Sequence, residues 1–168
     1  MKKHLSLFAV AACLAGTAHA DTQADFALIF ANCKASYQAL RAGGVVADVP
    51  PNWIRKITTA SQLRYEISQK YYSSPFVAVM TVDLTEAFGT ANSEAAAKQL
   101  VADADNRIKH DVVRLNYIHQ DGRWKTTSVD IMSETRRRRD EPWGPAVTTQ
   151  LTGDVLLRSS EPWVACIK

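Results

Sequence analysis

The sequence lacks most of the residue patterns that mark common catalytic sites. It has no Gly-x-Ser-x-Gly elbow of a serine hydrolase, no Cys-x-x-Cys redox pair and no glycine-rich phosphate loop ahead of a helix. Histidine is scarce, with four in 168 residues, and no His-x-x-x-His pair or Asp-rich loop supplies ligands for a metal ion. These absences favour a protein that is not an enzyme and that uses no cofactor and no metal.

The sequence also lacks an apolar run long enough to cross a bilayer, which takes about 20 residues. The N-terminal run, from Leu5 to Gly16, covers about 12 residues. It follows Lys2 and Lys3, and it precedes a small-x-small ending at residues 18–20. This order is typical of a secretory signal peptide. We therefore predict that residues 1–20 are cleaved and that the mature chain is not stably inserted in a membrane.

Cleavage after Ala20 would leave 148 of the 168 residues, enough for one domain, 21–168, in the periplasm or secreted. The alternative is a lipoprotein acylated at Cys13, because Val10-Ala11-Ala12-Cys13 resembles a lipobox. Cleavage there would leave a leader of only 12 residues, so soluble export is favoured.

Excess positive charge is nearly absent from the mature chain. The full sequence has 20 basic and 17 acidic residues, but Lys2 and Lys3 would leave with the leader. The remaining 18 basic residues give a formal charge of only +1. This balance argues against a globally basic protein that binds nucleic acid.

Only two cysteines, Cys33 and Cys166, remain after cleavage. In an oxidising compartment an even number of cysteines favours pairing, and two cysteines have one connectivity. We therefore predict a Cys33–Cys166 disulfide, with a pair of free thiols as the alternative. The bridge would close a loop of 133 residues, for which the chain-entropy model gives a stabilisation on the order of 4 to 5 kcal/mol.

Hydrophobic periodicity predicts most of the elements. Helical spacing from Phe26 to Leu40 predicts a helix with Cys33 on its buried face. A capping-box pattern at residues 59–62 predicts a second helix that ends before Ser73, and residues 45–57 read as a loop. The further predicted elements are a central strand at 76–84, a helix from about 93 to 108, and two last strands at 147–158 and 163–167.

The clearest local pattern is a β-hairpin. Strands at 112–119 and 124–132 flank Asp121-Gly122, a pair suited to a type I′ turn because both of its central residues need positive φ. A two-residue turn there would pair His119 with Trp124 and Leu115 with Ser128. Residues 133–145 form a charged connection that contains prolines, and Gly153 marks a bend in the following strand.

The order of these elements places about three helices on one face of a curved, mostly antiparallel sheet of about five strands, an α+β fold. The run Asp-Gly-Arg-Trp-Lys-Thr-Thr at residues 121–127 resembles the NTF2-like and cystatin-like superfamily, in which a Gly-x-Trp-Lys strand is common late in the domain. The resemblance implies a sheet that curves around a cone-shaped pocket. Members use this pocket for catalysis, ligand binding or assembly, so the resemblance does not choose among functions.

The most unusual local feature is the run Arg136-Arg137-Arg138-Arg139, followed by Trp143 between two prolines. Such a run is commonly a solvated loop, here partly neutralised by the acidic residues 134, 140 and 141. The alternative is a binding patch, because arginine forks bind carboxylate or phosphate in two places at once. Trp143 would add an aromatic anchor to such a patch.

The hairpin also offers a candidate pocket and a candidate catalytic pair. The candidate pocket residues are Tyr117, His119, Trp124 and Asp130, and Asp130 with His119 is the candidate acid and base pair. The simpler interpretation is that Asp130 is solvated or pairs with an arginine.

Three functions therefore compete at the level of sequence. The first is a small exported binding module, such as an inhibitor, an immunity-type protein or an accessory of envelope assembly, that recognises a protein or an anionic envelope component. The second is a pocket protein with a small apolar ligand, and the third is an enzyme that uses a carboxylate and a histidine. The absence of catalytic motifs favours the binding module.

The disulfide gives a direct test. We expect titration of the purified mature protein with a thiol reagent in denaturant to detect no free thiol, and two after reduction, because Cys33 and Cys166 would be paired. Detection of two thiols before reduction would contradict the pairing.

Overall fold

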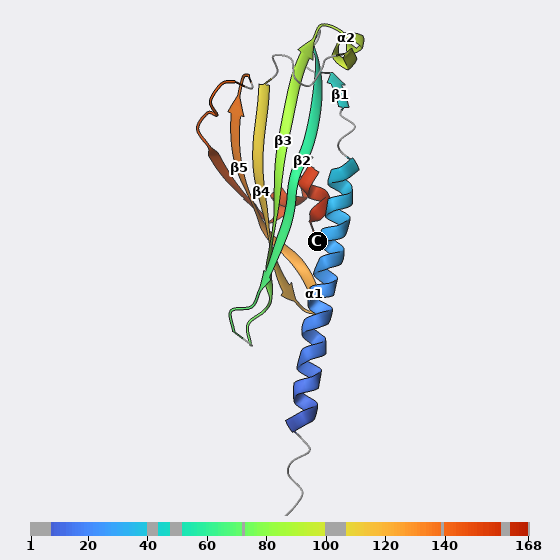
Figure 1. Ribbon diagram of the computed structural model, residues 1–168, viewed down its shortest axis with the longest axis vertical. Helices are drawn as coiled ribbons and strands as arrows, with labels where there is room; N and C mark the ends of the chain where they lie inside the picture. Colours follow the sequence, from blue (N-terminus) through green and yellow to red (C-terminus); the bar gives the residue numbers. More distant parts are fainter. Residues whose placement is uncertain are drawn as a thin grey trace, which may run out of the picture.

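The computed structural model describes residues 8–39, 44–47, 52–71, 73–99, 107–138, 140–158 and 162–167, with most side chains from Asp21 onward. Figure 1 shows the arrangement. The helices are α1 (Phe8–Ala39), α2 (Glu94–Gln99), α3 (Asp154–Arg158) and the 3-10 helix η2 (Pro162–Cys166). The strands are β1 (Gly44–Ala47), β2 (Trp53–Ser68), β3 (Val77–Ala91), β4 (Arg107–Gln120), β5 (Arg123–Arg136) and β6 (Val147–Thr152).

The described strands form one sheet in the order β1-β2-β3-β4-β5-β6, and each strand is antiparallel to the next. This meander confirms the predicted α+β fold with a curved antiparallel sheet (Figure 1), although the sheet has six strands where about five were predicted. Strands β2 to β5 have 14 to 16 residues each, so they extend well beyond the usual length of a strand. The sheet therefore dominates the fold, and α2 and α3 are short.

Helix α1 lies along one face of the sheet (Figure 1) and confirms the predicted helix. Its buried side chains Phe26, Cys33 and Tyr37 recur at helical spacing, and they belong to the same apolar cluster as the inner faces of β3, β4 and β5. The Phe26 ring lies 5.0 Å from the Tyr117 ring and 4.8 Å from the Trp124 ring, both in edge-to-face geometry. The part of α1 that precedes Asp21 extends beyond the sheet (Figure 1).

Three bonds connect α1, the C-terminal segment and the sheet. The predicted disulfide is present and joins Cys33 of α1 to Cys166 of η2. Tyr117 of β4 donates a hydrogen bond of 2.8 Å to the Cys166 carbonyl, and the Trp124 indole donates one of 3.1 Å to the Thr22 carbonyl. The C-terminal segment is therefore held between the helix and the sheet.

The predicted helix that starts at the capping-box pattern of residues 59–62 is wrong, because these residues lie inside β2. Leu63 and Ile67 are spaced as one face of a helix, but Tyr65 between them belongs to the same face. These three residues pair with the inward-facing Val82, Met80 and Ala78 of β3. The period is therefore two, as in a strand, and pairing with a long neighbouring strand outweighs the local capping signal.

Three other predicted elements also differ from the structure. The predicted loop at 45–57 contains β1 and the start of β2, with residues 48–51 outside the described part. Within the helix predicted from about 93 to 108, α2 covers residues 94–99 and Ile108 lies in β4, while residues 100–106 lie outside the described part. The C-terminal strand predicted at 163–167 is the 3-10 helix η2, and the strand predicted at 147–158 ends at Thr152 and is followed by α3. Gly153 supplies the bend between them with a φ of 57°.

The predicted hairpin is confirmed at its turn. Asp121 and Gly122 have φ values of 55° and 71°, and His119 pairs with Trp124. The Lys125 ammonium, 2.7 Å from the Asp121 carboxylate, lowers the pKa of that carboxyl through a hydrogen bond and its charge.

The register beyond the turn differs from the prediction. Leu115 pairs with Val129 and not with Ser128, because β5 has one extra residue opposite Asn116. This β-bulge shifts the alternation of β5, so Trp124 and Val129 point to the core while Asp130 points to the other face.

Among the described residues, no helix has the length and apolar character needed to cross a membrane.

Tyr117 is 2% exposed, and burial raises the pKa of its phenol above the usual value. Below about pH 10 the phenol is protonated in both the folded and the unfolded chain, so the folded state keeps its full stability. Above about pH 10 a tyrosine of the unfolded chain starts to ionise, and this contribution to stability is lost as the pH rises further. We expect Tyr117→Phe to lower the free energy of unfolding by about 1 kcal/mol at pH 8, because its hydrogen bond to Cys166 is lost.

Urea denaturation at several pH values tests this expectation. The difference between wild type and Tyr117→Phe should narrow between pH 10 and 12, because only the wild type can ionise this residue on unfolding. A constant difference over this range would contradict the assignment.

Candidate functional site

The arginine run lies where β5 ends beside the start of β4. Arg136 is the last residue of β5 and pairs with Ile108, so Arg107 of β4 lies next to it although the two arginines are far apart in the sequence. The chain then returns through a short loop, in which Gly144 donates a backbone hydrogen bond of 2.9 Å to Thr135. The pairing of β4 with β5 thus adds a fourth described arginine to the run.

Trp143 holds this loop against the sheet. The Arg136 guanidinium lies 4.4 Å from the centre of the Trp143 ring, which is the geometry of a cation–π contact. The His110 ring of β4 lies 5.6 Å from the same ring. Trp143 is 38% exposed, so its indole still presents surface to a partner. We define the arginine rim as Arg107, Arg136, Arg137, Arg138 and Trp143.

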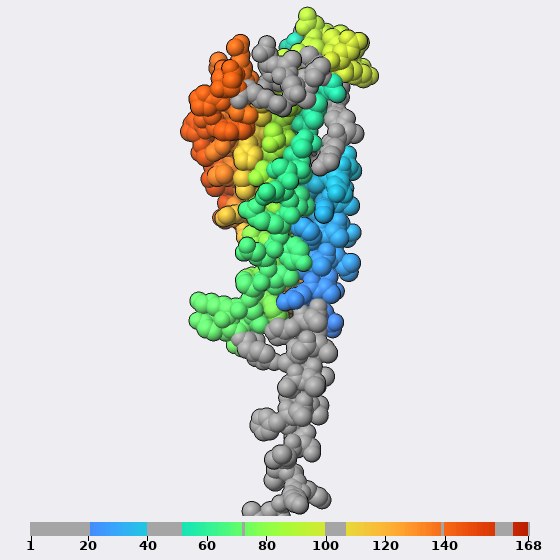
Figure 2. All heavy atoms as spheres, viewed as in Figure 1, coloured from blue at the N-terminus to red at the C-terminus, as the bar shows by residue number. Residues whose placement is uncertain are grey.

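The arginine rim borders a hollow of about 580 Å³. Figure 2 shows the loop and β6 as the orange-red margin on the left of the molecule. Three guanidinium groups and one carboxylate, that of Glu141, contribute to the walls of the hollow. Its lining residues are Arg107, Thr135, Arg136, Arg137, Glu141, Pro142 and Gly144. The surplus of positive charge and the many N–H donors suit an anion.

The predicted patch is therefore only partly described. Arg136 is half-buried, while Arg137 and Arg138 are exposed. Arg139 lies outside the described residues. Arg137 makes no ion pair within the described part of the chain. Sequence reasoning missed Arg107, because nothing in its local pattern indicates that strand pairing brings it to the run.

A second polar cluster lies on the outer face of the sheet, beneath the rim. His110 Nε2 lies 2.9 Å from Asp83 Oδ1, and His110 Nδ1 lies 3.9 Å from Glu134 Oε2. Ser61 donates a hydrogen bond of 2.9 Å to the same Asp83 oxygen. In a Ser-His-Asp triad the imidazole lies between the hydroxyl and the carboxylate, whereas here the carboxylate lies between them. His110 therefore cannot take the Ser61 proton, and its ring centre lies 5.6 Å from that of Trp143.

Two buried carboxylates lie on the inner face of the sheet, beyond the part that α1 covers. Glu86, 2% exposed, is 2.6 Å from the Lys56 ammonium, and Asp111, 4% exposed, is 2.8 Å from the Lys109 ammonium. Ser133 donates a further hydrogen bond of 2.6 Å to Asp111. Each carboxylate is thus compensated within the fold, as a buried charge requires.

The predicted pocket residues do not come together around one hollow. Tyr117 and Trp124 are buried against Phe26 of α1, so the helix occupies the concave side of the sheet at that point. The His119 ring contacts the Trp124 ring edge to face, with the ring centres 5.2 Å apart. Asp130 lies on the other face and accepts hydrogen bonds from Asn116 and Gln150, at 2.8 and 2.7 Å. The structure therefore does not place Asp130 beside His119.

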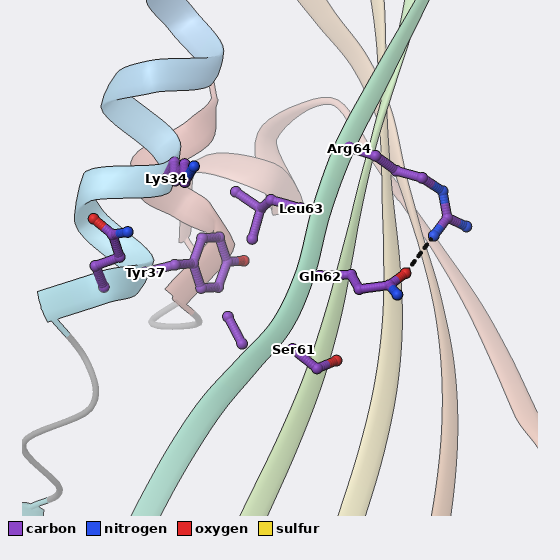
Figure 3. Close-up of a pocket in the computed structure, with 8 residues that line it drawn as sticks. Lys34, Tyr37, Ser61, Gln62, Leu63 and Arg64 are labelled. Atoms are coloured by element: carbon purple, nitrogen blue, oxygen red, sulfur yellow. Dashed lines mark hydrogen bonds between the residues drawn. The ribbon is translucent and has the colours of Figure 1, made fainter.

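A smaller hollow, of about 400 Å³, separates the C-terminal part of α1 from the bulge in β2 (Figure 3). Tyr37 and Leu63 point toward each other across it, while Arg64 points away and donates a hydrogen bond of 3.1 Å to Gln62 (Figure 3). Lys34 is the remaining charged group of its lining. With one ammonium group beside Tyr37 and Leu63, this hollow offers fewer charged groups to a ligand than the arginine rim does.

Within the described residues, no group of three or more histidine, cysteine, aspartate or glutamate side chains is placed to hold a metal ion. No protein-family model, no curated protein and no solved structure matches this chain. The function is therefore inferred from the geometry of the rim.

Gly144 provides a test of how the rim is built. A Cβ atom at this position would lie 3.1 Å from the Thr135 carbonyl oxygen, which belongs to the backbone and yields only by moving the strand or the loop. We expect Gly144→Ala to weaken the Gly144–Thr135 hydrogen bond and to increase amide hydrogen exchange in residues 137–146 severalfold.

The control for this test is Gly122→Asn, which changes a glycine at a turn position that tolerates asparagine and leaves the rim unaltered. Unchanged exchange of residues 137–146 in Gly144→Ala would contradict the close approach of the loop to β5.

Proposed function

We propose that the mature chain is an exported binding module that recognises an anionic partner at the arginine rim. The observation that carries this proposal is the hollow beside the rim, in which three arginines face one glutamate. Isolated surface arginines are usually solvated and contribute little. Arginines gathered around a concave surface can instead contact one anion together and share the cost of its desolvation.

The stacking of Arg136 supports the same proposal. A free arginine side chain loses up to about 2 kcal/mol of rotamer entropy when it is immobilised. The Trp143 ring already restrains the Arg136 guanidinium, and His110 supports that ring from the sheet. Part of the entropic cost of binding is thus met before the partner arrives, which favours affinity.

The expected partner presents carboxylate or phosphate groups. For an exported chain, the corresponding partners are an anionic component of the envelope or the acidic face of a protein. Nucleic acid is disfavoured by the predicted compartment and by the small net charge of the mature chain. The described residues of the rim include no nucleophile paired with a base, so the rim does not present a site for nucleophilic catalysis.

A pair of matched variants tests the proposal. We expect immobilised mature protein to bind poly-glutamate or polyphosphate at 50 mM NaCl, and binding to weaken strongly at 500 mM NaCl because exposed charges are screened. Replacing Arg137 and Arg138 by serine should weaken binding by tenfold or more, since each removes a charge-assisted hydrogen bond of about 1.5 to 3 kcal/mol. Biolayer interferometry measures both effects.

The control replaces the exposed Arg114 and Arg123 by serine, which lowers the net charge by the same amount away from the rim. Its binding should stay within about threefold of wild type. Equal losses in the two double variants would show that only net charge matters, and no binding of either polyanion would remove the proposal. Capture of envelope partners by the wild type, with and without high salt, then identifies the natural partner.

A further inference from the structure

Strand β6 forms an open edge of the sheet. Its neighbour is β5, and the sheet order places no described strand on its other side. Every second residue of an edge strand directs its N–H and C=O groups away from the sheet. Among the described residues, no backbone hydrogen bond to β6 other than those with β5 satisfies these outward groups. The edge is therefore able to accept another strand.

The sequence of β6 does not protect this edge. Proteins usually protect exposed edges with lysine, proline or other charged residues, or keep the edge strand very short. Strand β6 reads Val-Thr-Thr-Gln-Leu-Thr, with no charge and no proline, and four of its six residues are β-branched. All of its residues except Leu151 are exposed.

Apolar side chains are concentrated around the same edge. Of the eight large apolar side chains that are exposed in the described part of the chain, three belong to β6 or adjoin it: Val147 at its start, Met132 on the neighbouring β5, and Val155 just after its end. Val147 is 61% exposed although it shares its face of the sheet with the buried Val129. Exposed apolar groups around an unprotected edge mark an interaction surface.

We propose that β6 pairs antiparallel with β6 of a second copy of this chain and joins the two sheets into one. A two-fold axis that passes through Thr149, perpendicular to the sheet, places Val147 opposite Leu151 of the partner subunit, and the reverse pair follows by symmetry. The loop that precedes Val147 carries Arg137 and Arg138. The exposed Asp154, which follows Thr152, carries a negative charge. Antiparallel pairing therefore brings the basic loop of one copy toward the acidic end of the other.

The contact area determines the strength of this pairing. About five paired residues give about five backbone hydrogen bonds, and such an interface is smaller than that of an obligate dimer. We therefore expect a reversible dimer with a dissociation constant on the order of 10 to 100 μM. High local concentration on an envelope surface would favour it.

A dimer would present two arginine rims on one particle. This consequence rests on the proposed function, whereas the dimer itself does not. Two rims that contact one polyanion would bind it more tightly than either rim alone. Failure of polyanion binding leaves the dimer intact, and failure of dimerisation leaves each rim intact, so the two experiments have separate outcomes.

Sedimentation equilibrium of the mature protein between 5 and 500 μM tests the pairing. We expect the average mass to rise toward that of a dimer over this range. Thr149→Lys places a charge in the middle of the edge, where the symmetry axis brings it close to its own copy, and should raise the dissociation constant at least tenfold. Gln150→Lys is a second variant with the same expected effect. The control, Thr59→Lys, makes the same change at an exposed position of β2 and should dimerise like wild type.

Amide hydrogen exchange of the wild-type protein locates the interface. Residues 147–152 should become more protected at 500 μM than at 5 μM, while β2 stays unchanged. A monomer at 500 μM would overturn the proposal, as would a dimer with unchanged exchange in β6. If both lysine variants lost their fold, as judged by circular dichroism, the exchange measurement on the wild type would decide alone.

Discussion

The fold depends on the burial of helix α1 in the concave face of a long, twisted sheet. Phe26 lies at the centre of this contact, between the rings of Tyr117 and Trp124, and it fills the space that an open cone-shaped pocket would need. The disulfide from Cys33 to Cys166 holds the C-terminal segment in the same groove. Because the helix and the C-terminal segment occupy the concave side, the surface that remains open to a partner lies at the ends and edges of the sheet.

Local signals in the sequence predict several parts of this structure. The helix around Cys33, the strand from Val77, the Asp121-Gly122 turn and the disulfide follow from local periodicity, turn chemistry or cysteine number. The two β-bulges do not follow from such local signals. One extra residue in β2 lies opposite Leu84 and Asp83, and one extra residue in β5 lies opposite Asn116. Pairing between strands determines both bulges, and local periodicity does not reveal them. The bulge in β5 separates Asp130 from His119, and the strand pairing there could not be read from one chain segment.

The buried carboxylates and the arginine rim differ in how their charges are compensated. The carboxylates of Glu86 and Asp111 are buried, but each has a lysine partner within the fold. The rim differs, because its hollow gathers three arginines around one acid on a partly exposed surface. The run at 136–139 was visible in the sequence, whereas its neighbour Arg107 and the support from His110 come from the register of β4 with β5. The small net charge predicted for the mature chain thus conceals a local cluster of arginines.

The rim and the open edge are consequences of the same turn of the chain. A loop that folds back closely at Gly144 lets β6 start at Val147, so β6 pairs with residues 128–133 of the long strand β5 and not with its last three residues. This leaves the end of β5 free to display its arginines and leaves β6 itself as the last strand. If the loop moved away from Thr135, the stacking of Arg136 on Trp143 and the start of β6 would be disturbed together. The basic hollow and the edge are therefore linked through a few residues of one loop, although the partners proposed for them differ: an anion for the hollow and an extended strand for the edge.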